Sequence, residues 1–449
     1  MRKINYLIFI TLLLILTFGC SSDSDPVKDI IEQPTINQVS VFSFSKEFAY
    51  VNDEVSINGE NFPTNKSQVE ITLDNINVDI ISTNENSIVI KIPDGTGILP
   101  DLSIKILNST ISYNTTFEKI AILENTLNDW IEIEHSFSSI YKVKNFKAFD
   151  KEKIYFSLRE SENAAFTVYK AFNGGASIKT YDQLYSYFDF KGAFVLGEQG
   201  GEYSLRTNSL YYKKEKEEES QKISELSQNN SSWNLGLFVD SDETNMIVST
   251  PHGKVFESND GGNTFAIINE NDPDNRYEFE AFYAYSINQV WLGGYLYPFD
   301  ENENLNYYPA KILYLKDDGI WYNKLLNIEI MDGNREIIKD IKFIDGITGF
   351  AIVKITNWIT NEDKNVIIKS ETKGDTWNVV HENTQEIEDF TFKNKDIGWY
   401  ISGNEIFKTI DGGISWELDY TNNTECKSIL YNQDILWVIA NDKILKKYF

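Results

Sequence analysis

The chain has 449 residues, enough for two to three domains, and at 41% hydrophobic and 24% charged residues it can bury a sizeable core. Against 41 Lys and Arg stand 68 Asp and Glu, which gives a net charge of −27. This balance argues against nucleic acid as a partner, because phosphate binding needs clustered cationic side chains. The two cysteines exclude a disulfide scaffold and a cysteine-rich zinc site.

The first 20 residues carry a targeting pattern. Arg2 and Lys3 precede an apolar run of 13 residues, Tyr6–Phe18, which is too short to span a bilayer and has the length of a signal-peptide core. The run ends in Gly19-Cys20, which resembles the lipobox of bacterial lipoproteins. The resemblance implies that residues 1–19 are a signal peptide, that Cys20 is lipidated, and that the acyl chains anchor the protein in a membrane.

Polar residues follow this junction, so residues 20–33 are expected to form a flexible tether. The acidic stretch Ser21–Asp25 resembles the surface-export signal of Bacteroidota-type lipoproteins; the alternative is a plain polar tether. We therefore expect a lipid-anchored protein of the outer membrane that faces outward. Cys426 would be the one thiol left unmodified, which leaves no partner for an intrachain disulfide.

Short alternating strands fill the next segment, residues 34–120. Examples are Glu54–Ile57, Val69–Leu73 and Ser87–Ile92. Period-two alternation between turn residues is typical of antiparallel sheets with one buried face. The pattern and length predict an immunoglobulin-like sandwich.

Two stretches of this segment, Val55–Phe62 and Ser87–Pro93, resemble the IPT/TIG domain family. In that family a Gly-x-Asn-Phe turn follows a strand, and the resemblance implies that Phe62 anchors the core and that Pro93 ends a later strand. Asp53 stands where the family has a glycine. Such domains are mostly spacers or binding modules, so a structural role is expected.

Four later segments share one pattern: Ala171–Ile178, Ser258–Phe265, Ser370–Trp377 and Thr409–Trp416. They resemble the Asp-box of sialidase-like, sortilin-like and photosystem-assembly-factor propellers, Ser/Thr-x-Asp-x-Gly-x-Thr/Ser-Trp/Phe. The third copy has Thr372 in place of the Asp, and the first has Asn173 and Ile178. The pattern residues are Asn173, Gly175, Ser258, Asp260, Gly262, Thr264, Phe265, Ser370, Gly374, Trp377, Thr409, Asp411, Gly413 and Trp416.

The chemistry of the box predicts a structural turn. Glycines supply positive φ, the Asp carboxylate accepts backbone N–H bonds inside the turn, and the Ser or Thr hydroxyl ties the turn to the next strand. The Trp or Phe is expected to bury itself between neighbouring sheets. A metal-binding or catalytic role for Asp260 or Asp411 is the less favoured interpretation.

The spacing between the boxes indicates the number of repeats. The boxes begin at residues 171, 258, 370 and 409, so one repeat spans 39 residues, and the gaps of 87 and 112 hold two repeats each, with insertions in the second pair. Degenerate units are expected near residues 210 and 316, in Glu202–Tyr212 and Ile312–Trp321. This makes six units.

A seventh unit is expected to be split between the ends of the repeat region. The chain stops about one strand short of a complete unit, and Asp129–Ile133 has the pattern of the missing outer strand. We therefore predict that Trp130–Ile133 pairs antiparallel with the strand that contains Ile444 and Leu445. The predicted fold is all-β: an immunoglobulin-like sandwich followed by a seven-bladed β-propeller over residues 121–449.

The sequence gives little reason to expect a cofactor or a metal. Acidic loop patches at 240–243, 271–274 and 300–303 are interpreted as solvated surface, since none has EF-hand spacing. There is no Gly-x-Ser-x-Gly elbow, phosphate loop or His-Glu-x-x-His motif, and three histidines lie far apart, His135, His252 and His381.

Three functions compete. The first is a non-catalytic, monomeric surface lipoprotein whose propeller binds a glycan or a protein. The second is an exo-acting glycosidase, but resemblance to sialidases would require an Arg-Ile-Pro and three clamping arginines, and the sequence has no Arg-Ile-Pro. The third is an accessory factor for assembling a membrane complex. A cluster of exposed Trp and Tyr would favour glycan binding, and a broad apolar patch would favour a protein partner.

Overall fold

The computed structural model describes residues 37–449 with internal gaps, and the predicted lipobox with Cys20 and the tether lie outside the described residues. The gaps are residues 47, 115–116, 118, 124–127, 136, 138–139, 149–150, 152, 162–163, 165, 185–193, 199–200, 207–208, 215–219, 227–234, 271–276 and 297–306. The described residues are all-β, with one 3-10 turn, η1 Lys66–Gln68.

The N-terminal domain consists of a five-stranded sheet, a three-stranded sheet and a short added pair of strands. The first sheet has the order β6-β7-β3-β1-β9, the second the order β5-β4-β8, and β10 pairs with β2. Their bounds are β1 Asn37–Phe44, β2 Phe48–Tyr50, β3 Glu54–Glu60, β4 Val69–Leu73, β5 Ile76–Asn77, β6 Asp79–Asn84, β7 Ser87–Lys91, β8 Leu102–Ile106, β9 Ser109–Tyr113 and β10 Ala121–Leu123.

The core of this domain is aliphatic, with Phe62 as its one fully enclosed aromatic ring. Phe62 lies over Gly59, where an added Cβ would come within 2.6 Å of the ring. Glycine at that position therefore permits the close approach of strand and ring. The described geometry agrees with the Phe anchor that the sequence motif implies.

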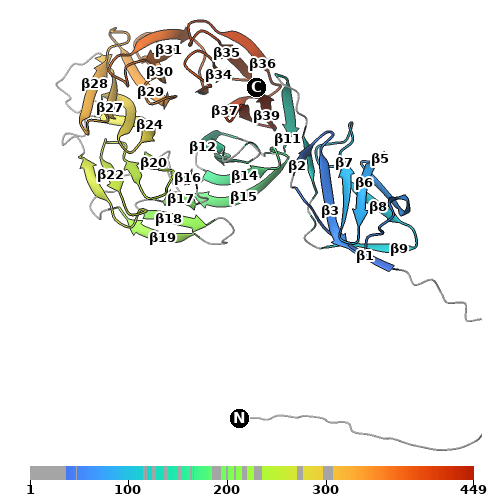
Figure 1. The fold of residues 1–449 in the computed structure, drawn as a ribbon. Helices are drawn as coiled ribbons and strands as arrows, with labels where there is room; N and C mark the ends of the chain where they lie inside the picture. The colour runs from blue at the N-terminus through green and yellow to red at the C-terminus, as the bar shows by residue number, and fades with distance from the viewer. Residues whose placement is uncertain are drawn as a thin grey trace, which may run out of the picture.

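The N-terminal domain is joined to the rest of the chain by packing as well as by covalent connection. β10 pairs in parallel with β2, and Ile122 belongs to the core of the N-terminal domain, so the pairing of this domain runs past residue 120, the boundary predicted from the sequence. Ile98 packs against a hydrophobic cluster formed by later strands, including Ile133 and Trp437. Figure 1 shows the domain beside β11.

The remaining described residues form seven sheets, six of four strands and one of five. In chain order the strands are β11 Trp130–Glu134, β12 Lys142–Ala148, β13 Ile154–Arg159, β14 Phe166–Phe172, β15 Ser177–Leu184, β16 Phe194–Leu196, β17 Gly201–Arg206, β18 Ser209–Lys214, β19 Gln221–Glu225, β20 Gly236–Val239, β21 Met246–Ser249, β22 Val255–Ser258 and β23 Ala266–Asn269. They continue with β24 Tyr277–Ser286, β25 Gln289–Leu296, β26 Tyr307–Tyr308, β27 Ala310–Leu315, β28 Trp321–Leu326, β29 Asn334–Phe343, β30 Gly349–Asn357, β31 Glu362–Ser370, β32 Asn378–Asn383, β33 Asp389–Phe392, β34 Gly398–Ser402, β35 Glu405–Thr409, β36 Glu417–Thr421, β37 Cys426–Asn432, β38 Ile435–Ala440 and β39 Lys443–Tyr448.

The seven sheets follow one another around a ring, giving a propeller-like arrangement (Figure 1). Most sheets pair consecutive strands in chain order, the exceptions being β11, which pairs with β39, and β26, which pairs with β29. The first strands of successive sheets contact one another, for example β12 with β16, β20 with β24, and β33 with β37. Between β29 and β33 the link is the Lys342 ammonium, which lies 2.6 Å from Asp389 Oδ1. The unit expected near residue 210 is the sheet β16–β19, and the unit expected near residue 316 is the sheet of β24, β25, β27 and β28.

One sheet contains both ends of the repeat region and is called the closing sheet here, with strand order β11-β39-β38-β37. β11 pairs antiparallel with β39, with Ile131 opposite Lys446 and Ile133 opposite Ile444. This confirms the predicted pairing of the segment around Trp130 with the C-terminal strand. Figure 1 shows β11 beside β39 near the C-terminus.

The largest fully buried side chains of the ring lie on second strands. Trp291 in β25, Trp399 in β34 and Trp437 in β38 are each fully buried. A buried tryptophan side chain removes roughly 150–250 Å² of surface from water, so these three supply much of the apolar burial between neighbouring sheets. The core of the ring is therefore carried by the second strands more than by the box aromatics.

Candidate binding surface

The fourth box turn is held by its own polar side chains. Thr409 Oγ1 accepts from Gly413 N at 3.0 Å, and Asp411 accepts from Ser415 N at 2.9 Å and from Ser415 Oγ at 2.5 Å. These bonds, led by the one from the Ser415 hydroxyl, lower the pKa of Asp411 to about 2. The Trp416 indole N–H donates to Gly413 O at 2.9 Å, and its ring is half-buried.

The second box turn repeats this arrangement. Ser258 Oγ accepts from Gly262 N at 2.9 Å, and Asp260 accepts from Thr264 N at 2.9 Å and from Thr264 Oγ1 at 2.7 Å. The bond from the Thr264 hydroxyl is the largest of the causes that lower the pKa of Asp260. Phe265 is half-buried. Both carboxylates, Asp260 and Asp411, thus accept hydrogen bonds from backbone and hydroxyl donors of their own turns.

The third box turn replaces the carboxylate by a hydroxyl. Thr372 Oγ1 accepts from Thr376 N at 2.8 Å and lies 2.8 Å from Thr376 Oγ1, while Ser370 Oγ accepts from Gly374 N at 2.9 Å. Trp377 donates its indole N–H to Gly374 O at 3.0 Å. The same turn therefore forms with one acceptor oxygen where Asp260 and Asp411 use two.

The first box turn is secured from outside. Asn173 adopts φ +54°, and its Oδ1 has no hydrogen-bond partner among the described residues. The Lys446 ammonium donates to Gly174 O at 3.1 Å, and His135 Nε2 lies 2.7 Å from Gly175 O. These contacts join the first box to the closing sheet, where β39 and the end of β11 lie.

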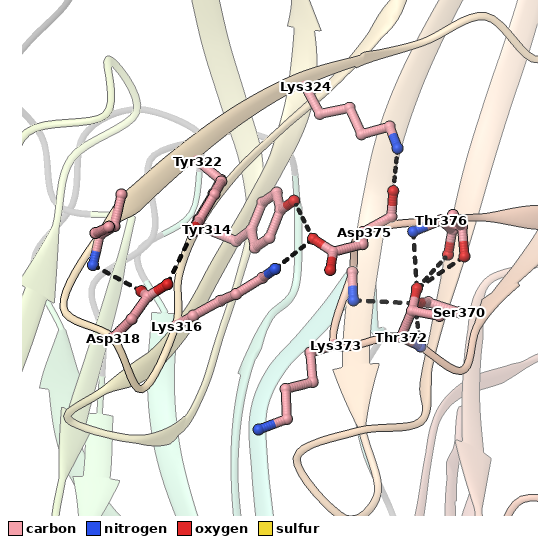
Figure 2. Close-up of polar contacts among 12 residues, drawn as sticks. Tyr314, Lys316, Asp318, Tyr322, Lys324, Ser370, Thr372, Lys373, Asp375 and Thr376 are labelled. Atoms are coloured by element: carbon pink, nitrogen blue, oxygen red, sulfur yellow. Dashed lines mark hydrogen bonds and ion pairs between the residues drawn. The ribbon is translucent and has the colours of Figure 1, made fainter.

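A polar cluster fills the junction between the β24–β28 sheet and the third box turn (Figure 2). Asp375 accepts from Tyr314 OH at 2.7 Å and pairs with Lys316 at 2.5 Å, and its backbone carbonyl accepts from Lys324. Figure 2 shows Asp318 and Tyr322 a short distance along the same hairpin, joined by a hydrogen bond of 2.7 Å. The cluster ties two neighbouring sheets together by charge-assisted bonds.

The chemistry of this cluster is that of ion pairs. Burial opposes ionisation of Asp375, but hydrogen bonding to Lys316 and Tyr314 outweighs it and lowers the pKa of Asp375. The Lys373 ammonium lowers the pKa of Asp317, and the Ile320 amide lowers that of Asp318. A glycosidase needs one carboxyl with a raised pKa as proton donor, and these three are shifted the other way.

Burial raises the pKa of three carboxyls elsewhere in the described residues, Glu336, Asp340 and Glu388. Glu336 is fully enclosed and accepts from Glu329 N at 2.6 Å and from Ala310 N at 3.3 Å. Its carboxylate fastens the connection from β28 to β29. This position under a loop suits a structural role, since solvent and substrate do not reach the carboxyl.

The other end of the sheets is different in character. Consecutive strands are antiparallel, so the turns from second to third strand and the connections to the next sheet share one end, which is called the loop face here. Exposed apolar side chains gather there on the β28–β29 connection and on the β30–β31 turn, beside the half-buried Tyr308 of β26. This set is called the loop-face cluster: Tyr308, Ile330, Met331, Trp358 and Ile359.

The exposure in this cluster is high for such large side chains. Ile330 is 73% exposed, Ile359 62%, and Met331 and Trp358 each 45%. The Tyr308 and Trp358 rings pack at 5.0 Å with an interplanar angle of 39°. A contiguous exposed apolar set of this kind on a soluble domain marks a binding surface or an aggregation liability.

None of these five residues was singled out from the sequence. The one signal was the spacing, because the gap of 112 residues between the second and third boxes required insertions. The structure places the loop-face cluster in that interval, around β26 and the β28–β29 connection, and on the turn that follows β30. The sequence predicted extra residues there but not which side chains they would expose.

The remaining candidates are unremarkable in geometry. Cys426 is buried, and burial raises the pKa of its thiol to about 12. Within the described part of the chain, no three His, Cys, Asp or Glu side chains gather as a metal site would require. Over the same part, no helix is long and apolar enough to cross a membrane.

Comparison with known families supports the N-terminal domain. Residues 34–119 match the family model of the IPT/TIG domain. This establishes the immunoglobulin-like character of the segment that the Gly-x-Asn-Phe motif indicated. No curated protein has a sequence that matches this chain.

A solved structure with a TM-score of 0.50 supports the likeness in fold. The chain is similar to YCF48 bound to a D1 peptide, with a TM-score of 0.50 and 12% identity over 71% of this chain and 96% of that one. YCF48 from Cyanidioschyzon merolae aligns with a TM-score of 0.49 and 12% identity, over 71% and 98%. An auxiliary nutrient binding protein from Bacteroides thetaiotaomicron aligns with a TM-score of 0.36 and 10% identity, over 93% and 99%. At such identities the likeness concerns the fold alone.

Proposed function

We propose that this protein is a non-catalytic, monomeric lipoprotein of the outer membrane whose propeller binds a glycan or a protein at the cell surface. Cys20 carries the lipid, residues 20–33 form the tether, and residues 34–120 form a spacer that holds the binding domain off the membrane. Residues 121–449 form a closed seven-bladed propeller. The partner binds at the loop-face cluster.

The closed ring is supported by the sheets and their contacts. Seven sheets follow one another, the first strands of neighbouring sheets contact, and β11 completes the closing sheet by pairing with β39. Closure removes the unpaired edges that an open array of sheets would expose. The loop-face cluster then lies on a rigid scaffold.

The single observation that carries the binding role is the exposure of the loop-face cluster. Burying an apolar side chain stabilises an association by about 25 cal/mol per Å² of apolar surface. Trp358, Met331 and two isoleucines leave much of this surface in water in the free chain. Tryptophan and methionine are also among the residue types enriched in protein interfaces.

The non-catalytic assignment is supported by the state of the carboxylates. The carboxylates of Asp260 and Asp411 accept hydrogen bonds from their own box turns. At the third box junction, Asp375 and Asp317 are ion-paired with lysines. Burial raises the pKa of three described carboxyls: Glu336 is enclosed, Asp340 pairs with Lys342 at 3.1 Å, and at Glu388 the charge of Glu386 adds to the shift. Acid–base catalysis of glycoside cleavage needs one accessible protonated and one accessible ionised carboxyl.

The anchor is tested by Cys20→Ser. The variant should lose metabolic labelling with a radioactive fatty acid in a bacterial host and should fail to partition into detergent. Cys426→Ser serves as the matched control and should keep the label. Unchanged labelling of Cys20→Ser would overturn the lipoprotein assignment without bearing on the binding surface.

The binding surface is tested by photo-crosslinking in the native cell. A benzophenone amino acid at position 358 or 359 should form adducts, because the probe inserts into C–H bonds of both proteins and glycans within reach. The matched control is position 414, where Ile414 is 71% exposed on the fourth box turn. Absence of adducts at 358 and 359, or equal adducts at 414, would contradict the proposal.

A further inference from the structure

We infer that the loop-face cluster recognises a polypeptide segment that carries apolar side chains together with lysine or arginine. This inference rests on the proposed binding function and specifies the chemistry of the partner. It follows from which groups of the cluster point to solvent, how the turn is fixed, and what charges surround it.

The exposed groups are mainly aliphatic. Sugar recognition uses the open face of an aromatic ring, but here Trp358 packs against Tyr308 at 5.0 Å, so the two rings cover part of each other. The most exposed members are Ile330 and Ile359, with Met331 beside them. Branched aliphatic tips and a thioether favour apolar side chains of a partner over sugar hydroxyls.

The cluster is fixed in place before any partner binds. Trp358 N donates to Gly333 O at 3.0 Å, and Asn357 Oδ1 accepts from Ile359 N and Thr360 N, each at 2.9 Å. Ile359 lies over Gly333, where an added Cβ would come within 2.7 Å of Ile359 Cγ1. Little ordering is then lost when a partner binds.

Asn357 links this turn to the neighbouring connection. Its Nδ2 donates to Asn334 Oδ1 at 2.7 Å and to Asp332 O at 3.1 Å, so the turn after β30 and the β28–β29 connection are held together. Ile330 and Met331 come from that connection, and Trp358 and Ile359 from the turn. The apolar side chains therefore form one built surface rather than two independent loops.

The surroundings of the cluster are acidic. Residues 329–335 and 357–364 contain four carboxylates against two cationic side chains: Glu329, Asp332, Glu362 and Asp363 against Arg335 and Lys364. Lys364 pairs with Glu329 of this set and with Glu382, Lys354 pairs with Asp363, and the Arg335 guanidinium lies 5.8 Å from the Tyr295 ring centroid. The negative charge at this surface therefore rests mainly on Asp332 and Glu362, both exposed.

The wider field has the same sign. Tyr295 donates to Glu278 at 2.8 Å, and burial together with this carboxylate raises the pKa of Tyr295. The whole chain carries a net charge of −27. A negative rim around an apolar centre attracts a cationic partner and repels anionic polymers, so lysine or arginine beside the apolar anchors completes the match.

The test selects peptides without presupposing their sequence. A phage-displayed library of random dodecapeptides is panned on the full-length protein, in parallel with the double variant Trp358→Ala/Ile359→Ser and the control Ile410→Ser/Ile414→Ser. Both control side chains are 71% exposed on the fourth box turn. Thermal melting of all three proteins checks that each is folded.

Selected peptides should combine Leu, Ile or Phe with Lys or Arg, and their affinity for the native protein should fall as the salt concentration is raised. Their affinity for the Trp358→Ala/Ile359→Ser variant should be lower by about tenfold or more. The control variant should bind as the native chain does. Acidic peptides, equal binding to both variants, or no enrichment would overturn the inference. Neutral glycans bound on an array and lost in Trp358→Ala/Ile359→Ser would also overturn it, yet would leave the proposed binding function standing. The proposed function itself would fail if photo-crosslinking at positions 358 and 359 gave no adducts at the cell surface.

Discussion

The two ends of the propeller sheets use tight turns in opposite ways. At the box end, Asp411 accepts from Ser415 N and Ser415 Oγ, and the turn closes upon its own polar groups. At the loop face, Asn357 also accepts from two successive backbone amides, but the residues that it holds are Trp358 and Ile359. The same local chemistry thus closes the box turn at one end and holds Trp358 and Ile359 toward solvent at the other, although the box turn also exposes Ile410 and Ile414.

This contrast separates stability from binding. Box residues contact their own turn and the preceding sheet, as when Trp291 Nε1–H donates to Lys373 O at 2.9 Å across the sheet boundary. Loop-face residues contact solvent and one another. Substitutions at the box end should therefore change the free energy of unfolding, and substitutions at the loop face should change association.

The largest effect should come from removing β11, the strand that pairs with the C-terminal strand β39. Deleting residues 128–134 removes Ile131 and Ile133, both buried, and exposes the edge of β39. The lost burial alone is about 4–10 kcal/mol, comparable with the whole stability of a domain. We expect aggregation, measured by light scattering, and loss of a cooperative melting transition.

A synthetic peptide of residues 128–134 provides the control for this deletion. If the defect is an open edge, the peptide should pair with β39 and recover soluble protein, whereas a scrambled peptide should not. A deletion variant that stays monomeric and melts as the native chain does would show that β11 is dispensable.

The next effect concerns the buried tryptophans that join sheets. Trp437 is fully buried in the closing sheet, 3.4 Å from the place where a Cβ on Gly175 of the first box would lie. Trp437→Ala should lower the free energy of unfolding by about 3–5 kcal/mol, as for other large aromatic core residues. Urea denaturation followed by tryptophan-independent circular dichroism measures it.

Trp437→Phe separates packing from polarity in this position. The Trp437 Nε1–H has no hydrogen-bond partner among the described residues, so phenylalanine removes an unpaired donor along with some volume. We expect a loss of stability well below that of the alanine variant. Equal losses for the two variants would mean that the indole N–H, not the ring, matters there.

The box carboxylates should give the third effect, and it should depend on pH. Asp411 has its pKa lowered to about 2 in the folded chain from an ordinary 3.8, so its stabilisation is complete above pH about 4 and is lost as the pH falls toward about 2. Asp411→Ala should lower stability at pH 7 by about 1 kcal/mol, as for other exposed capping residues. Melting of the variant and the native chain should converge at pH about 2.

Thr372→Ala is the matched comparison in the third box, where a hydroxyl does the work of the carboxylate. Thr372 Oγ1 accepts from Thr376 N at 2.8 Å, and no titration is involved. The stability difference between Thr372→Ala and the native chain should be constant between pH about 4 and 2. A convergence like that of Asp411→Ala would show that acid acts elsewhere in the chain.

The sequence predicted the parts of this molecule that recur. Glycine turns flanked by Ser, Thr and Asp recur because the same backbone turn needs the same donors and acceptors. The pairing of Trp130–Ile133 with β39 followed from counting strands. Phe62 was marked by a motif for the same reason. The three fully buried tryptophans share the second-strand position, a recurrence that was present in the sequence but weaker than the box.

The loop-face cluster could not be predicted in this way because it occurs once. Its five residues come from three separate segments that are brought together by the ring, and an exposed Ile330 reads in the sequence like any core isoleucine. The spacing of the boxes indicated where residues had been inserted. What those residues expose depends on Asn357 and Gly333, whose contacts are visible only in three dimensions.

The smallest effect on stability should come from the loop-face cluster itself. Trp358→Ala/Ile359→Ser changes side chains that face solvent, while the backbone of the turn is held by Asn357 and Gly333. We expect the free energy of unfolding to change by no more than about 0.5 kcal/mol, even though peptide binding is lost.

Asn357→Ala sharpens the contrast, because Asn357 is buried and its amide joins the two segments of the cluster. That variant should lose both stability, by about 1–3 kcal/mol, and binding. A double variant as destabilised as Asn357→Ala would mean that the apolar residues serve the fold, and that the loop face is built like the box end after all.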